Sequence, residues 1–150
     1  GGLIQCSLIL LSGEPGVGKA TFLAQISDSI VKNNKSFANV LYVSGEESAG
    51  QVKLRLERLK CNLKSFNFVS ETNLEKIIST AIKNKPDLLI ADSIQTIYSS
   101  LVPSEAGGVS QIRTIAAVSY THLRAHETPE HLVCRLLLEK KKTNIIHNTV

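Results

Sequence analysis

The stretch SLILLSGEPGVGKATFLAQI, residues 7–26, predicts a strand, a glycine-rich turn and a helix in immediate succession. Residues 7–13 form a short apolar run that ends in glycine, which is typical of a buried strand in a parallel sheet. Beyond Gly18 the apolar side chains recur at helical spacing, at Phe22, Leu23, Ile26 and Ile30. Strand, turn and helix in this order are the building unit of an α/β domain.

The same alternation continues to about residue 117. Further strands are predicted at residues 39–45, 66–70 and 87–93, and further helices at residues 48–59, 72–84 and from residue 109 onward. Thr72 is the expected cap of the helix at 72–84, with Glu75 three residues on as in a capping box. The predicted fold class is therefore α/β, with a mainly parallel sheet flanked by helices.

The turn at residues 13–21 closely follows the pattern G-x-x-x-x-G-K-[ST] of a phosphate-binding P-loop, or Walker A motif. Its glycines let the backbone turn successive N–H groups inward around phosphate oxygens, and the following helix adds the positive end of its dipole. Lys19 would reach the β- and γ-phosphates as a point charge. The predicted ATP-binding residues are Gly13, Glu14, Pro15, Gly16, Val17, Gly18, Lys19, Ala20 and Thr21.

Ala20 departs from this pattern, because the motif has a serine or threonine there and Thr21 comes one position late. The missing hydroxyl would be an inner-shell ligand of Mg²⁺, which prefers octahedral oxygen coordination. Thr21 lies about 100° further round the helix and should not simply replace it. We expect phosphate binding by the glycines and Lys19 to survive this loss better than hydrolysis does.

Carboxylates follow two of the predicted strands. Asp92 ends the apolar run LLIAD as in a Walker B strand, whose aspartate holds Mg²⁺, usually through water. Glu46 and Glu47 follow the strand at 39–45, at the edge where open parallel sheets bind ligands, and a glutamate there would suit deprotonation of a water. From chemistry alone, an equal alternative is that these acids are favoured by the dipole of the next helix.

Four stretches are informative together, namely GEPGVGKAT, LYVSGEESAGQVKLRLERL, SETNLEKI and PDLLIADSIQTIYSS…GGVSQIR. Within them, VSGEESAGQ and DSIQT extend well past generic P-loop patterns. Together they resemble the RadA (Sms) family of bacterial DNA-repair ATPases, which belongs to the RecA-like group, and the resemblance covers residues 1–117. It implies that Glu46 is the catalytic base, with Glu47 the less favoured second carboxylate and Lys19 the catalytic lysine. It also suggests Gln95, after the Walker B strand, as a sensor of the γ-phosphate.

The resemblance implies an ATP-driven motor of DNA repair and recombination, which forms a homo-oligomeric ring and promotes branch migration on DNA in the cytoplasm. ATP and Mg²⁺ are the implied cofactors, and DNA is a partner by resemblance alone. The alternative is a non-catalytic nucleotide-binding module in which Ala20 marks weakened Mg²⁺ binding and lost hydrolysis. A small P-loop kinase is disfavoured, because the acidic residues after the strands suit water activation better than a substrate-hydroxyl pocket.

Several features of that family have no counterpart in this sequence. We find neither the four-cysteine zinc module nor the later strands of the RecA core, and expect residues 1–117 to be the N-terminal part of the ATPase domain. Accordingly we expect the fragment alone to hydrolyse ATP poorly or not at all. Because core strands are lacking, its exposed sheet edges should favour aggregation.

Composition fits one soluble domain, with 150 residues of which 43% are apolar. No apolar run reaches membrane-spanning length, so no membrane association is expected. The three cysteines are widely spaced and imply no disulfide framework, which favours a reducing cytosol. Of the net charge of +4, residues 1–117 carry +2 (12 Lys and Arg against 10 Asp and Glu) and the rest carry +2 (5 against 3).

The chain changes character after Ala117. VSYTHLRAHET, residues 118–128, resembles the translation of a transposon-based sequencing adapter, and HLVCRLLLE, residues 131–139, resembles the far end of that adapter in the same frame. We therefore interpret residues 118–142 as non-native, leave 118–150 out of the predicted fold and assign no origin to 143–150. A zinc site is rejected on this ground, although its ligand types fit at His122, His126, His131 and Cys134.

The substitution Ala20→Ser should raise the Mg²⁺-dependent turnover of ATP by a completed domain, because it restores the hydroxyl that the motif supplies to the metal. Steady-state ATPase rates over a range of Mg²⁺ concentrations would measure the gain. Unchanged turnover would contradict the role given to this position.

Overall fold

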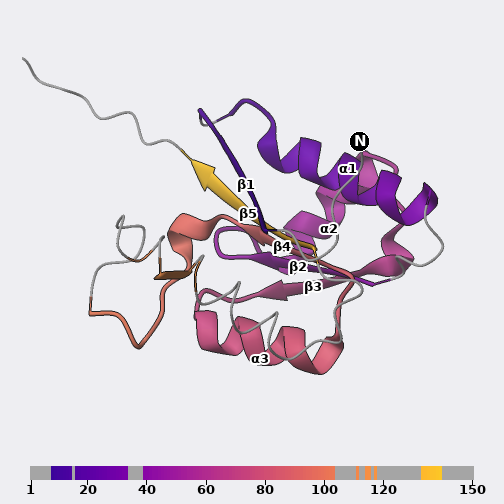
Figure 1. Cartoon of the computed structure of the whole chain (residues 1–150). Helices are drawn as coiled ribbons and strands as arrows, with labels where there is room; N and C mark the ends of the chain where they lie inside the picture. The colour runs from indigo at the N-terminus through magenta and orange to yellow at the C-terminus, as the bar shows by residue number, and fades with distance from the viewer. Residues whose placement is uncertain are drawn as a thin grey trace, which may run out of the picture.

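The computed structural model describes residues 8–14, 16–33, 39–103, 111, 114, 115, 117 and 133–139, and it is a layered α/β structure (Figure 1). Five parallel strands form one sheet in the order β1-β5-β4-β2-β3. The strands are β1 (Leu8–Gly13), β2 (Val40–Ser44), β3 (Phe66–Ser70), β4 (Leu88–Asp92) and β5 (Val133–Glu139). The helices are α1 (Lys19–Asn33), α2 (Ala49–Arg58) and α3 (Leu74–Asn84), with short 3₁₀ turns η1 (Leu63–Ser65) and η2 (Ile94–Thr96).

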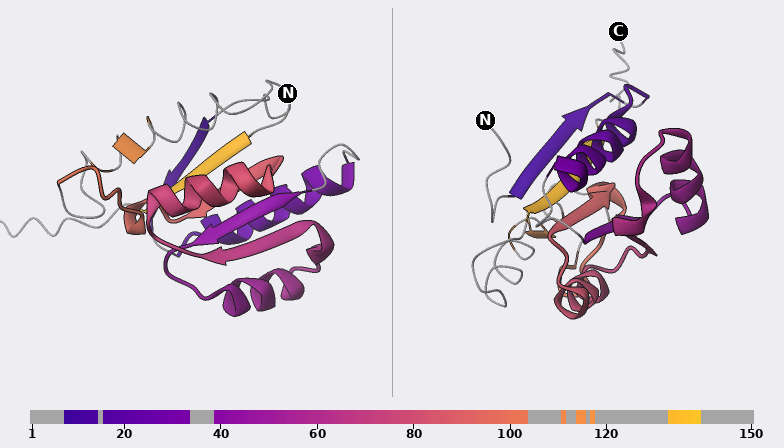
Figure 2. Two further views of the ribbon diagram at one scale, coloured as in Figure 1. Left: turned by 90° about the horizontal axis from the view of Figure 1, so that it is seen from below. Right: turned by 90° about the vertical axis from the view of Figure 1, so that its right-hand side faces the viewer.

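Helices cover both faces of the sheet, as the views in Figure 2 show for α1 and α3. Alternate residues of β2 point to opposite faces: Val40 and Tyr42 lie in one core cluster, and Leu41 and Val43 in the other. The first cluster receives buried side chains from α1 and α2, and the second receives them from α3. Because both faces are buried, the central strands are almost wholly apolar, which is the pattern that the sequence displays.

The predicted fold class is confirmed, and the first four strands and three helices lie within a few residues of their predicted bounds. The predicted cap of α3 is wrong by one residue. Asn73 is the cap, and its side chain accepts a hydrogen bond from the Lys76 N–H. Glu75 does not close a capping box, because its carboxylate instead accepts a hydrogen bond from the hydroxyl of Ser99. The helix expected from residue 109 is represented by helical residues at 111, 114, 115 and 117.

Strand β5 occupies a place that the sequence analysis left without a strand. It lies between β1 and β4 and pairs in parallel with both, although residues 118–142 had been left out of the predicted fold. The physical reason is that a central parallel strand needs little more than a short, mostly apolar run, and VCRLLLE supplies one. The predicted fold class stands, and the correction concerns residues 133–139, which form a strand of the sheet although the sequence analysis left them out of the fold.

No helix in the part of the chain that the structure describes is both long and apolar enough to cross a membrane.

Helix α2 offers a matched test of the core. Leu56 is completely buried between α2 and the sheet, whereas Leu54, on the same helix, is 56% exposed. Leu56→Ala should lower the free energy of unfolding by about 2–5 kcal/mol, because it removes buried methyl groups and leaves a cavity. Leu54→Ala should change it by less than about 0.5 kcal/mol. Urea denaturation of both variants would measure the difference, and equal effects would contradict the described packing.

Candidate functional site

The carboxyl ends of β1, β2 and β4 bring the predicted functional residues to one edge of the sheet. Ser44, the last residue of β2, lies opposite Asp92, the last residue of β4. The Gly45 N–H donates to the Asp92 carbonyl over 3.0 Å, so the two strands stay joined where they end. Ligands of open α/β sheets bind at this edge, where the loops leave the strands.

The loop between β1 and α1 has the backbone that the P-loop prediction required at two of its glycines. Gly16 and Gly18 have φ angles of 81° and 85°, in the left-handed region that side chains with a Cβ disfavour. Gly13 is different, because its φ is not in that region. A Cβ there would lie 3.4 Å from the Val17 side chain, an ordinary van der Waals contact. Pro15 lies outside the described residues.

Lys19, the first residue of α1, folds back over this loop. Its Nζ donates hydrogen bonds to the carbonyl oxygens of Gly13 at 3.0 Å and Glu14 at 2.6 Å. The residue is only 9% exposed, so its positive charge is held inside the loop and not out in solvent. The ammonium group therefore lies within the loop that the sequence assigns to phosphate.

Ala20 and Thr21 follow in the first turn of α1, and both are half-buried. Ala20 thus places a methyl group in the first turn of α1, where the motif has a hydroxyl.

Glu46 is exposed, and its carboxylate is hydrogen-bonded to the residue that follows β4. The hydroxyl of Ser93, which follows Asp92, donates to Glu46 Oε1 over 3.0 Å. Ser93 is itself buried, so it gives the glutamate a fixed anchor. The structure thus brings Glu46 next to the Walker B strand, although the two residues are far apart in sequence.

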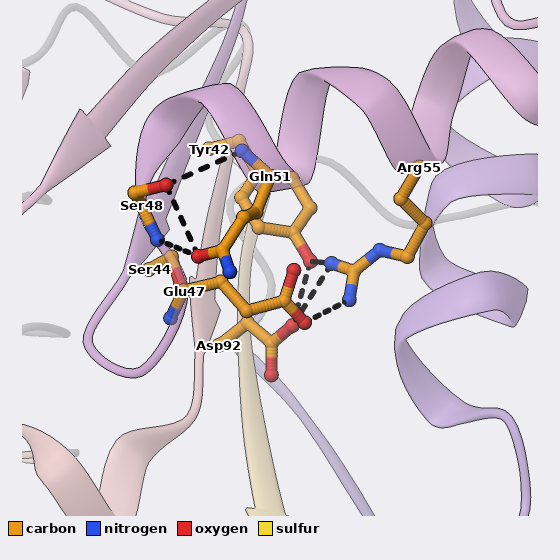
Figure 3. A network of polar contacts seen from close by, with 7 residues as sticks. All are labelled: Tyr42, Ser44, Glu47, Ser48, Gln51, Arg55 and Asp92. Atoms are coloured by element: carbon orange, nitrogen blue, oxygen red, sulfur yellow. Dashed lines mark hydrogen bonds and ion pairs between the residues drawn. The ribbon is translucent and has the colours of Figure 1, made fainter.

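Glu47 has a different environment, shown in Figure 3, where it and Asp92 share one arginine. Arg55 of α2 forms an ion pair with Glu47 and lies 3.5 Å from Asp92 Oδ2. The same Oδ2 accepts a 2.7 Å hydrogen bond from the Tyr42 hydroxyl, which in turn accepts from Arg55 over 3.0 Å. Asp92, Tyr42, Arg55 and Glu47 therefore form one continuous polar network.

The Tyr42 hydroxyl acts as a donor within this network. Burial raises the pKa of Tyr42 far above its ordinary value, and the nearby Asp92 charge raises it further. The phenol therefore stays protonated and its proton remains available to Asp92. Sequence reasoning missed Tyr42 and Arg55, yet both carried a signal. A buried tyrosine in an otherwise aliphatic strand needs a partner for its hydroxyl, and Arg55 lies three residues after the buried Val52 on α2.

Gln95 lies in η2, directly after the Walker B strand, and is half-buried. Its proximity to any phosphate stays a prediction. The four residues of the rejected zinc site fall outside the described side chains, since 122–132 are not described and Cys134 is described by its backbone only.

The fold and this edge of the sheet define the class of protein. A parallel α/β sheet with a P-loop after β1 and an acid at the end of β4 is the RecA-like P-loop architecture. The family model described as an AAA domain matches residues 1–121, and the chain belongs to that family.

The comparison with curated proteins narrows the resemblance to one group. The chain is 44% identical over 139 residues to the "DNA repair protein RadA" of Aquifex aeolicus, covering 93% of this chain and 30% of that protein. It is 46% identical to the protein of the same name from Campylobacter jejuni and 51% identical to that of Streptococcus pyogenes, over 77% and 78% of this chain. In both of these cases it spans 25% of the relative's length.

Gly45 joins β2 to the acidic residues and leaves no room for a side chain. A Cβ there would lie 2.0 Å from Thr96 Oγ1 and 2.8 Å from Thr96 Cβ. Gly45→Ala must therefore displace η2, and we expect it to lower the free energy of unfolding by about 1–3 kcal/mol. Gly50→Ala is the matched control: the nearest atom to its Cβ is 4.0 Å away, and alanine favours helix α2 by up to about 1 kcal/mol. Urea denaturation would compare them, and a Gly45→Ala variant as stable as the parent would contradict the close approach.

Proposed function

We propose that this chain binds ATP at the loop of residues 13–21 and belongs to a Mg²⁺-dependent ATPase that acts on DNA during repair and recombination. The observation that carries the proposal is the loop itself. Gly16 and Gly18 adopt positive φ, Lys19 lies inside the loop, and α1 begins directly behind it. Backbone N–H groups, a helix dipole and an ammonium group suit a polyphosphate.

Asp92 fits the role of an Mg²⁺ ligand that acts through water. Among the described residues, Tyr42 and Arg55 both contact Asp92 through Oδ2. Carboxylate oxygens are ligands that Mg²⁺ prefers. When bound, Mg²⁺ would neutralise charge on the β- and γ-phosphates. Asp92 would hold it from the end of β4, and Ala20 supplies no second oxygen ligand.

Glu46 is the better candidate for the base that takes a proton from the attacking water. It is exposed and anchored by Ser93, whereas the Glu47 carboxylate is held in an ion pair with Arg55. Lys19 would hold the phosphates, and Gln95 would contact the γ-phosphate from the segment after β4. These assignments agree with the roles that the family resemblance gives to the same positions.

The wider activity is proposed from the relatives. Proteins named for DNA repair match this chain over most of its length, but the chain spans only a quarter to under a third of theirs. We therefore propose DNA as the partner and a homo-oligomeric ring as the working assembly, in the cytoplasm. The alternative is a nucleotide-binding module without hydrolysis, which Ala20 favours because it removes an Mg²⁺ ligand.

We also propose that residues 118–142 are not native to this protein. The family match ends at residue 121, and the matches to the Campylobacter jejuni and Streptococcus pyogenes relatives extend over 115 and 118 residues. These shorter extents support a boundary near residue 117, where the adapter resemblance begins. The match to the Aquifex aeolicus relative covers 139 residues, 93% of this chain, and so includes part of the segment beyond that boundary.

Nucleotide binding by the 150-residue chain tests the proposal. A fluorescent ATP analogue should bind, and Lys19→Ala should weaken it by at least about tenfold, equal to about 1.4 kcal/mol. Lys32→Ala, an exposed lysine in the last turn of the same helix, should leave affinity unchanged. Binding that does not respond to EDTA would favour the non-catalytic alternative. Equal affinity of the parent and the Lys19→Ala variant would refute the proposal.

A further inference from the structure

Arg55 is the one cation that contacts Asp92 or Glu47 among the residues that the structure describes. It reaches from α2 across the ends of β2 and β4, and Figure 3 shows its guanidinium group pointing at both carboxylates. Its two terminal nitrogens divide the contacts. Nη1 pairs with Glu47, while Nη2 lies 3.0 Å from the Tyr42 oxygen and 3.5 Å from Asp92 Oδ2. One positive charge thus serves two acids.

The orientation of the guanidinium group is set by these acids. Its Nε is buried and has no hydrogen-bond partner among the described residues, a condition that costs about 1–3 kcal/mol for a buried donor. The unpaired Nε indicates that the terminal nitrogens are directed toward Glu47 and Asp92 at the expense of the rest of the side chain.

We propose that Arg55 is an internal counter-ion that opposes Mg²⁺ at Asp92 and thereby sets how strongly nucleotide binding depends on the metal. The proposal rests on the proposed function, in which Asp92 holds Mg²⁺. Arg55 is a positioning residue in this scheme, since it acts through Asp92 and Glu47. The second effect of its charge is to keep Glu47 paired, which leaves Glu46 as the carboxylate available to water.

Electrostatics fixes the sign of the effect. A positive charge beside Asp92 repels a divalent cation and attracts the more negative, metal-free form of ATP. Removing that charge should therefore favour the Mg²⁺ complex of ATP over free ATP. The side chains of Arg55 and Asp92 are 23% and 20% exposed, so water and salt screen the interaction only in part.

The measurement uses a fluorescent ATP analogue and two dissociation constants. The ratio is the dissociation constant in EDTA divided by the dissociation constant at saturating Mg²⁺. Arg55→Met, which keeps an unbranched apolar stem and removes the charge, should raise this ratio by about three- to tenfold. Arg55→Lys keeps the positive charge on which the effect depends and should leave the ratio within about twofold of the parent, although an ammonium group cannot reproduce the planar contacts of the guanidinium group. Arg58→Met, an exposed position in the same helix turn, is the matched control and should also leave it unchanged.

A role in folding alone would alter both constants together and leave their ratio unchanged, so an unchanged or lower ratio in folded Arg55→Met overturns the proposal. Circular dichroism checks folding. If that variant does not fold, Arg55→Gln carries the same prediction, and failure of both to fold would show that Arg55 is a structural partner and overturn the proposal.

If the parent chain binds no nucleotide, the proposed function fails and this inference fails with it. If the parent binds with a metal-dependent ratio that Arg55→Met does not change, only the Arg55 inference fails.

Discussion

The parallel register between β2 and β4 is the constraint on which the site depends. It sets Ser44 opposite Asp92, and the hydrogen bond from the Gly45 N–H to the Asp92 carbonyl extends the pairing beyond the last residue of β2. Gly45 also packs so closely on Thr96 that the two segments leaving the strands have one relative position. The contact between Ser93 and Glu46, which follow these two strands, depends on that shared endpoint.

The charges at the carboxyl ends of these strands are partly balanced by two cations. Glu46, Glu47 and Asp92 gather where β2 and β4 end, and such a concentration of negative charge would repel a polyphosphate. Arg55 offsets part of it from α2, and Lys19 brings a second positive charge into the loop after β1. The two cations differ in kind. The planar guanidinium group can bond two carboxylates at once, whereas the lysine ammonium group acts as a point charge.

Much of this architecture could be predicted from the sequence because it depends on local patterns. The apolar run before Gly13, the P-loop spacing and the acid at the end of β4 each identify an element and a position. The network around Tyr42 and Arg55 could not, because it joins residues of two strands and a helix whose spacing is set only by the fold. The capping of α3 failed for a related reason: Glu75 matched a local motif, but Ser99, brought close by the fold, takes its carboxylate.

Strand β5 affects how the loop after β1 is aligned with Asp92 at the end of β4. In the sheet order β1 is an outermost strand, and β5 lies between it and β4. Leu136 is paired with Leu10 on one side and with Ala91 on the other. In this chain the register between β1 and β4 is therefore set by a strand from the segment that we propose is not native. A slip of two residues would preserve which side chains face each core, yet it would move the loop after β1 by about 6.6 Å along the strand axis. That distance is longer than a hydrogen bond and a metal–ligand bond added together. Lys19 and Asp92 would then no longer reach the same phosphate group, even though the helices remained packed on both faces of the sheet.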